Sequence, residues 1–229
     1  MIFVGDGALL RRAVAHAADR GHPVDLVCSA DPADAAGAGP HLLVGADIDA
    51  HAAALAAASS DGIVWSLNNR RIFRAPVLSL GLRLYNVHNG LLPRHRGLPS
   101  VAVLHAVLHG HPAYGATLHE VDAGIDTGRV LAERRFPIGP EDRFHQVMLR
   151  GVRACQQLFE EQLPAVAAGR AVPADALAGR PAGPSAYHGV RDLGRLAHWR
   201  DHPAYARATD LGPFAAHAPE LVEAIRRLS

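Results

Sequence analysis

Three side chains in the middle of the chain have the chemistry needed for acyl transfer to an amine: Asn86, His88 and Asp126. A carboxamide N–H can stabilise the oxyanion that forms when a nucleophile attacks a carbonyl, an effect of roughly 2.7–4 kcal/mol per donor. A neutral imidazole can take the proton from the attacking nitrogen. A carboxylate close to that imidazole orients the ring and favours its charged form. The three residues supply one of each group.

A predicted strand over residues 82–88 must position the first two of these side chains. Alternate side chains of a strand share a face, so Asn86 and His88 leave the end of the strand side by side. Asn89-Gly90 predicts a turn directly afterwards, and open α/β sheets bind ligands at the carboxyl ends of their parallel strands. An Asn-x-His pair or an Asp-Thr-Gly turn is, by itself, more typical of turn chemistry. Their conjunction favours a site.

The motifs around these residues resemble those of the 10-formyltetrahydrofolate-dependent formyltransferases, a resemblance that extends over most of residues 1–170. They are Asn86-x-His88-x-x-Leu91-Leu92-Pro93, Arg96-Gly97, Gly115-x-Thr117-x-His119 and Asp126-x-Gly128. The resemblance implies that Asn86, His88 and Asp126 are the catalytic residues. Asp126, rather than Asp122, matches the acidic position of the family because Thr-Gly and a hydrophobic strand follow it.

The resemblance also implies that 10-formyltetrahydrofolate is the co-substrate. The family holds the pterin ring between the acidic loop and a backbone segment one helix before the Asn-x-His, which here is Arg71-Ile72-Phe73. The expected folate contacts are Arg71, Ile72, Phe73, Leu91, Val121, Asp122 and Ile125. No metal is expected.

The alternation of predicted strands and helices indicates an α/β fold with a Rossmann-like, doubly wound and mainly parallel sheet. We expect a catalytic domain over residues 1–179, followed by a linker and a small C-terminal helical extension over residues 180–229. Residues 29–40 predict a surface loop. Strands are expected at 1–4, 24–28, 62–65, 82–88, 115–121 and 129–138, and helices at 8–20, 48–58, 75–80, from 99 and from 141 onward, with short helices near 190–200 and 219–228.

Composition narrows the possible partners. Hydrophobic residues make up 49% of the 229 residues, the formal net charge is +1, and no basic block occurs, so neither nucleic acid nor a membrane is an expected partner. Two cysteines do not make a disulfide scaffold, and Met1 to Asp6 enters a strand without a charged leader. We therefore expect a cytoplasmic protein, which could form a homodimer.

The fifteen histidines raise the question of a metal site. His105 and His109 are one helical turn apart and His111 follows, a spacing that can bind zinc. The glutamate of an H-E-x-x-H motif is missing, so we interpret them as surface or edge histidines. His119 matches a family position and could form a wall of the site, although a strand histidine with a satisfied hydrogen bond is also consistent with the sequence.

Two differences from better-known relatives narrow the range of expected acceptor substrates. Asp6 stands where the ribonucleotide formyltransferase has a phosphate-binding loop, and the residues after Pro184 are too few for the basic barrel of methionyl-tRNA formyltransferase. The remaining acceptors are an amine of a small metabolite, an amino acid or peptide, or an amino sugar, in a secondary-metabolite or siderophore pathway. Two alternatives stay open: a 10-formyltetrahydrofolate hydrolase, and a non-catalytic folate-binding sensor or assembly protein, which has no need for all three catalytic groups.

Overall fold

The computed structural model describes residues 1–170 and 184–228. The chain forms two compact units, each made of segments that are separate in the sequence. The first combines Met1–His88, Thr117–Ala132 and Cys155–Ala178, and the second combines Asn89–Ala116, Glu133–Ala154 and Gly179–Ser229. The expected boundary between residues 179 and 180 lies outside the described residues and stays a prediction.

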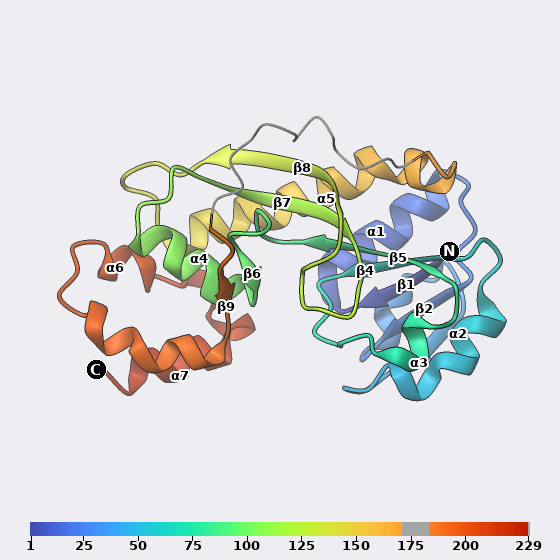
Figure 1. The fold of residues 1–229 in the computed structure, drawn as a ribbon, viewed down its shortest axis with the longest axis horizontal. Coiled ribbons are helices and arrows are strands. Elements are labelled where there is room, and N and C mark those ends of the chain that lie inside the picture. The colour runs from blue at the N-terminus through green and yellow to red at the C-terminus, as the bar shows by residue number, and fades with distance from the viewer. Residues whose placement is uncertain (171–183, 229) are drawn as a thin grey trace. The chain divides into compact units, whose positions relative to one another are not determined.

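Seven strands form one sheet in the order β3-β2-β1-β4-β5-β7-β8, and Figure 1 shows β1, β4 and β5 side by side. Neighbours from β3 to β5 are parallel, and β5 pairs with β7 in the antiparallel sense. The predicted Rossmann-like, mainly parallel sheet is confirmed. The strands are β1 (Ile2–Gly5), β2 (Leu26–Ser29), β3 (His41–Leu43), β4 (Ile63–Leu67), β5 (Arg83–His88), β7 (Ala113–Glu120) and β8 (Val130–Pro137).

Two features before α2 were not predicted from the sequence: the strand β3 and a 3₁₀ turn in the segment that precedes it. β3 has three residues, none of them fully buried, so it carries no hydrophobic pattern that could reveal a strand. Residues 29–40 were predicted as a surface loop, but they contain a 3₁₀ turn, η1 (Pro32–Ala35), in which Asp34 and Ala35 are buried. The buried Asp34 has a structural role at the start of the first helix, which its sequence context does not reveal.

The helices of the first unit cover the sheet with apolar side chains. They are α1 (Gly7–Asp19), α2 (Ala52–Ala58), preceded by a 3₁₀ turn η2 (Asp49–His51), and α3 (Ala75–Leu78), while the long α5 (Phe144–Ala167) runs through both units. Val4 and Leu84 belong to a buried cluster that includes residues of α2 and α3. Trp65 points to the opposite face, where its ring lies 4.9 Å from that of Phe159 on α5. By the same alternation, His88 shares the face of Leu84.

The second unit is built around α4 (Pro99–Leu108), which is buried on most of its surface rather than along a single stripe. Apolar residues from the C-terminal part of the chain pack against it. Ser100 Oγ donates a hydrogen bond to Glu220 Oε1 over 3.1 Å, and β6 pairs with β9 in parallel. The other elements are β6 (Arg96–Gly97), β9 (Tyr187–His188), α6 (Tyr205–Ala208), α7 (Pro219–Arg226) and the 3₁₀ segments η4 (Val190–Trp199) and η5 (Gly212–His217).

Several histidines of the second unit lie against one another. His95 Nε2 is 3.0 Å from His111 Nδ1, and His105 Nδ1 is 3.3 Å from His109 Nε2. Burial lowers the pKa of His105 to about 4, with further lowering by His188 and His109, and burial together with the Arg94 guanidinium lowers the pKa of His111 to about 4. His105 and His111 are half-buried and His109 is exposed, which agrees with the expectation of surface or edge histidines.

Two features of the described residues bear on metals and membranes. Across residues 1–170 and 184–228, no three His, Cys, Asp or Glu side chains are grouped closely enough to hold a metal ion. In the same ranges, no helix combines the length and the apolar composition that crossing a membrane requires.

The buried histidines should make the protein less stable in acid. Because the folded state lowers the pKa of His105 and His111 from 6.5 to about 4, the unfolded chain binds more protons between these pH values. The free energy of unfolding should be greatest above about pH 6.5 and should fall as the pH decreases toward about 4. Urea titrations across this range measure the effect. In the variant His105→Gln/His111→Gln the decrease should be smaller, and an equal decrease would show that other groups cause it.

Candidate active site

The pairing of β5 with β7 determines which side chains meet at the end of β5. Asn86 lies opposite His119, and His88 lies opposite Thr117. The side chains of His88 and His119 are 5% and 3% exposed. The strand end therefore presents a half-buried amide beside two imidazoles that are almost withdrawn from water, where electrostatic interactions are stronger than in the solvent.

The loop after β7 brings Asp126 to these groups through an unusual backbone conformation. Asp126 has φ +53°, in the left-handed region that costs energy for residues with a side chain and that is concentrated at functional sites. Asp122 stabilises the loop, because its Oδ1 accepts from Gly124 N at 3.0 Å and from Thr127 Oγ1 at 2.6 Å. A Cβ at residue 128 would lie 1.8 Å from the carbonyl oxygen of Glu120, so only glycine fits there. The shape of the loop thus requires glycine at residue 128.

The carboxylate of Asp126 is shared between two imidazoles. Its Oδ2 is 3.6 Å from His88 Nδ1, and its Oδ1 is 3.5 Å from His119 Nε2. Both distances exceed an ordinary hydrogen bond, as is common for catalytic groups before a substrate binds. The arrangement places Asp126, rather than Asp122, against the histidines.

His119 does more than line the site, because it orients Asn86. His119 Nδ1 lies 2.7 Å from the carbonyl oxygen of Glu120, which can only accept, so the neutral ring carries its proton on Nδ1. Nε2 is then an acceptor, and it receives one N–H of Asn86 over 3.0 Å. The second N–H of the same amide is left to meet an oxyanion. The sequence motif marked His119, but only the strand register shows that it faces Asn86.

The residues that the resemblance assigns to folate binding differ in exposure. Ile72 and Ile125 are 45% and 39% exposed, although both are large and apolar. Arg71 and Phe73, on either side of Ile72, are buried. The exposed isoleucines are therefore available to an apolar ring, whereas Arg71 and Phe73 can contact a ligand only through their backbone.

Val121 and Leu91 are the two remaining residues expected to contact the folate, and neither is an exposed apolar residue. Val121 is half-buried against the apolar cluster that includes Val4. Leu91 belongs to the second unit, where it is buried and its backbone N–H donates to His95 Nδ1 over 3.1 Å. The roles of all these residues in folate binding stay predictions.

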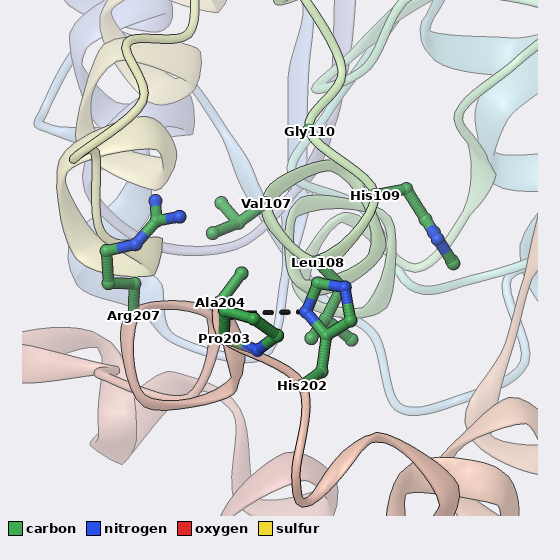
Figure 2. A pocket seen from close by; sticks show the side chains of 8 residues that line it. All are labelled: Val107, Leu108, His109, Gly110, His202, Pro203, Ala204 and Arg207. Atoms are coloured by element: carbon green, nitrogen blue, oxygen red, sulfur yellow. Dashed lines mark hydrogen bonds between the residues drawn. The ribbon is translucent and has the colours of Figure 1, made fainter.

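One hollow of the second unit and the two cysteines lack the groups for this chemistry. A hollow of about 440 Å³ in the second unit is lined by residues 107–110, 202–204 and Arg207, and none of these lining residues has a carboxylate. Figure 2 shows His109 pointing away from His202 and Arg207. Cys28 and Cys155 are buried, and burial raises the pKa of both thiols to about 12, so neither is a ready nucleophile.

A Rossmann-like sheet that presents an amide, an imidazole and a carboxylate at the end of a parallel strand has the groups that acyl transfer requires. Residues 5–163 match the model of the formyl transferase family. The chain belongs to this family.

Individual relatives cover different shares of the chain. A methionyl-tRNA formyltransferase from Myxococcus xanthus is 35% identical over 88 residues, which are 38% of this chain and 28% of that protein. The match therefore covers less than a third of that relative.

Two solved structures share the fold over most of the chain. A sugar N-formyltransferase from a Shewanella species has a TM-score of 0.70 at 20% identity, covering 91% of this chain and 87% of its own. A formyltransferase from Anoxybacillus kamchatkensis, in complex with UDP-4,6-dideoxy-4-formamido-L-AltNAc and tetrahydrofolate, has a TM-score of 0.62 at 19% identity, covering 92% of this chain and 96% of its own.

Replacing Asp126 tests its role directly. Asp126→Asn keeps the size of the side chain and removes the charge that would stabilise an imidazolium, so kcat/KM for formyl transfer should fall about 100-fold or more. Glu120→Gln is the matched control, because its carboxylate pairs with Arg129 at the surface, 2.6 Å away, and its loss should change kcat/KM by less than about twofold. Turnover of Asp126→Asn close to that of the control protein would contradict the role.

His119 should affect kcat through Asn86. In His119→Leu the amide of Asn86 loses the acceptor that holds it, so kcat should fall about tenfold while KM for the formyl donor changes little. His119→Gln offers a carbonyl oxygen to the same N–H and should recover part of the rate. Steady-state kinetics on variants with native circular dichroism provides the measurement, and an unchanged kcat in His119→Leu would show that Asn86 needs no such support.

Proposed function

We propose that the protein is an N-formyltransferase that moves the formyl group of 10-formyltetrahydrofolate to an amine of a small acceptor. The observation that carries this proposal is the cluster at the end of β5, where one carboxylate faces two imidazoles and one of these holds the amide of Asn86. Attack of an amine on a formyl carbon needs a proton acceptor and an oxyanion donor, and the cluster contains both.

The proposed reaction assigns a step to each side chain. The lone pair of the acceptor nitrogen attacks the formyl carbon, and the C=O π electrons move to the oxygen, where the free N–H of Asn86 donates to the oxyanion. His88 takes a proton from the acceptor nitrogen, and Asp126 stabilises the imidazolium that results. The tetrahedral intermediate collapses as the bond to N10 of the folate breaks, and His88 gives that proton to N10. The products are an N-formyl amine and tetrahydrofolate.

Two observations support a reduced folate as the donor. The A. kamchatkensis formyltransferase with the same fold contains tetrahydrofolate. In the present chain, Ile72 and Ile125 expose apolar side chains to a degree that is uncommon for isoleucine, and a pterin ring offers a matching apolar face.

The start of α1 argues against an acceptor held there by a phosphate. Free N–H groups at a helix N-terminus are a common phosphate site. Here the N–H of Gly7 already donates to Asp34 Oδ2 over 3.0 Å, and Asp34 is paired with Arg11 at 2.7 Å. The carboxylate of Asp6 stands at the same helix end. A ribonucleotide phosphate at this helix end could not use the N–H of Gly7 and would lie beside two carboxylates, each already paired with an arginine.

The remaining acceptors are an amino sugar, an amino acid or a peptide, as expected for a biosynthetic enzyme. Structures named for sugar substrates share the fold over about nine-tenths of this chain, so an amino sugar nucleotide is the first acceptor to test.

The acceptor can be found by following tetrahydrofolate release. The wild-type protein, supplied with 10-formyltetrahydrofolate and separate pools of amino sugar nucleotides, amino acids, hydroxylated ornithines and short peptides, should turn over with one pool. Mass spectrometry should then show that one acceptor has gained one CO. Asn86→Ala is the inactive control, expected to be at least about 100-fold slower.

The other outcomes separate the alternatives. Formate release without any amine identifies a hydrolase, and folate binding without turnover in any pool favours a non-catalytic binder. Failure to bind the folate would overturn the proposed function itself.

A further inference from the structure

The side chain of Arg71 is fully occupied inside the first unit, although it belongs to a segment assigned to ligand binding. It is 5% exposed. A guanidinium has five N–H donors, and here each has an acceptor. Nη1 donates to Asp6 Oδ2 at 2.7 Å and to Gly5 O at 3.4 Å, Nη2 donates to Asp6 Oδ1 at 3.0 Å and to Val44 O at 2.9 Å, and Nε donates to Gly45 O at 2.7 Å.

These contacts join the carboxyl ends of three parallel strands. Asp6 directly follows β1, Val44 directly follows β3, and Arg71 lies a few residues beyond β4. Asp6 is fixed independently, since its Oδ1 also accepts from the N–H of Ala30 after β2 over 2.8 Å. A carboxylate tied to two loops therefore receives the guanidinium through a bidentate ion pair, the geometry that best restricts an arginine.

The backbone of the same segment is fixed from the other side. The side chain of Asn69 bonds to both backbone groups of Arg71: its Oδ1 accepts from Arg71 N at 2.9 Å, and its Nδ2 donates to Arg71 O at 3.1 Å. Phe73, two residues further on, is buried in the apolar cluster of the first unit. With Arg71 and Phe73 both directed inward, Ile72 between them is directed outward and is 45% exposed.

We propose that Asp6 is a positioning residue for the folate: through Arg71 it fixes the backbone of residues 71–73 and the outward direction of Ile72. This inference rests on the proposed function, because it concerns the same folate site. Asp6 itself need not touch the ligand. Because Asp6 neutralises the charge of Arg71, the guanidinium is not available to bind the carboxylates of the folate tail.

The burial of Arg71 makes the effect of Asp6 specific. Arg71 is buried although Asp6 is 36% exposed, so removal of Asp6 leaves an uncompensated buried charge, which tends to move toward water and take its segment with it. Removal of both partners is often tolerated. Asp6→Asn should therefore disturb residues 71–73 while the rest of the sheet keeps its structure. Asp6→Asn/Arg71→Met should recover thermal stability without restoring the attachment of the segment.

Folate affinity and hydrogen exchange test the proposal together. The probe is 5-formyltetrahydrofolate, titrated into the full chain by calorimetry. Asp6→Asn should weaken binding about tenfold or more, since small misplacements of binding groups have effects of this size. The amides of Ile72 and Phe73 should exchange faster, with β1 and β4 unchanged. The double variant should regain its thermal midpoint but not its affinity. Arg74→Gln, which removes a 62% exposed guanidinium three residues away, is the matched control and should bind as the wild type does.

Three results would overturn the proposal. Affinity of Asp6→Asn within about twofold of the wild type would show that the pair does not position the site. Affinity that recovers together with stability in the double variant would show that the pair only stabilises the fold. A wild-type protein that does not bind 5-formyltetrahydrofolate would remove the proposed function and this inference with it, whereas normal wild-type binding with unaffected variants removes the inference alone.

Discussion

The antiparallel register between β5 and β7 is the constraint on which the candidate site depends. It places Asn86 opposite His119, and the amide of one bonds to the ring of the other. A shift of one residue would turn His119 to the other face of the sheet and leave Asn86 without its acceptor. Val87 and Leu118 lie opposite each other in the same register and are both buried, so a shift would also disturb apolar packing. Core packing thus fixes the catalytic geometry.

The sequence predicted the parts of the site that are local. Asn86 and His88 share a strand face because of the two-residue repeat. Asp126 was assigned through the resemblance to the formyltransferases, because an Asp-Thr-Gly turn is by itself typical of turn chemistry. The alternation of strands and helices also predicted the fold correctly. These features follow from spacing along the chain, where backbone geometry leaves few alternatives.

The remaining features depend on residues that are distant in the sequence. Asn86 and His119 are 33 residues apart, and Asp6 and Arg71 are 65 residues apart. Neither contact follows from a local period, since each depends on which strands become neighbours and in what register. The same reason explains why β3 was missed: it is recognisable only through its pairing with β2. Long-range pairing is the part of a fold that short motifs do not encode.

Two carboxylates at the carboxyl ends of strands in the first unit, those of Asp126 and Asp6, interact differently with positive charge. At the end of β5, the carboxylate of Asp126 lies 3.5–3.6 Å from two imidazoles, close enough to stabilise a cation. At the end of β1, the carboxylate of Asp6 is in a bidentate ion pair with a permanently charged guanidinium. The first arrangement can respond when a proton arrives at His88, whereas the second joins the loops that follow β1, β3 and β4. Groups that move protons depend on a scaffold that stays in place, and ion pairs of the second kind supply it.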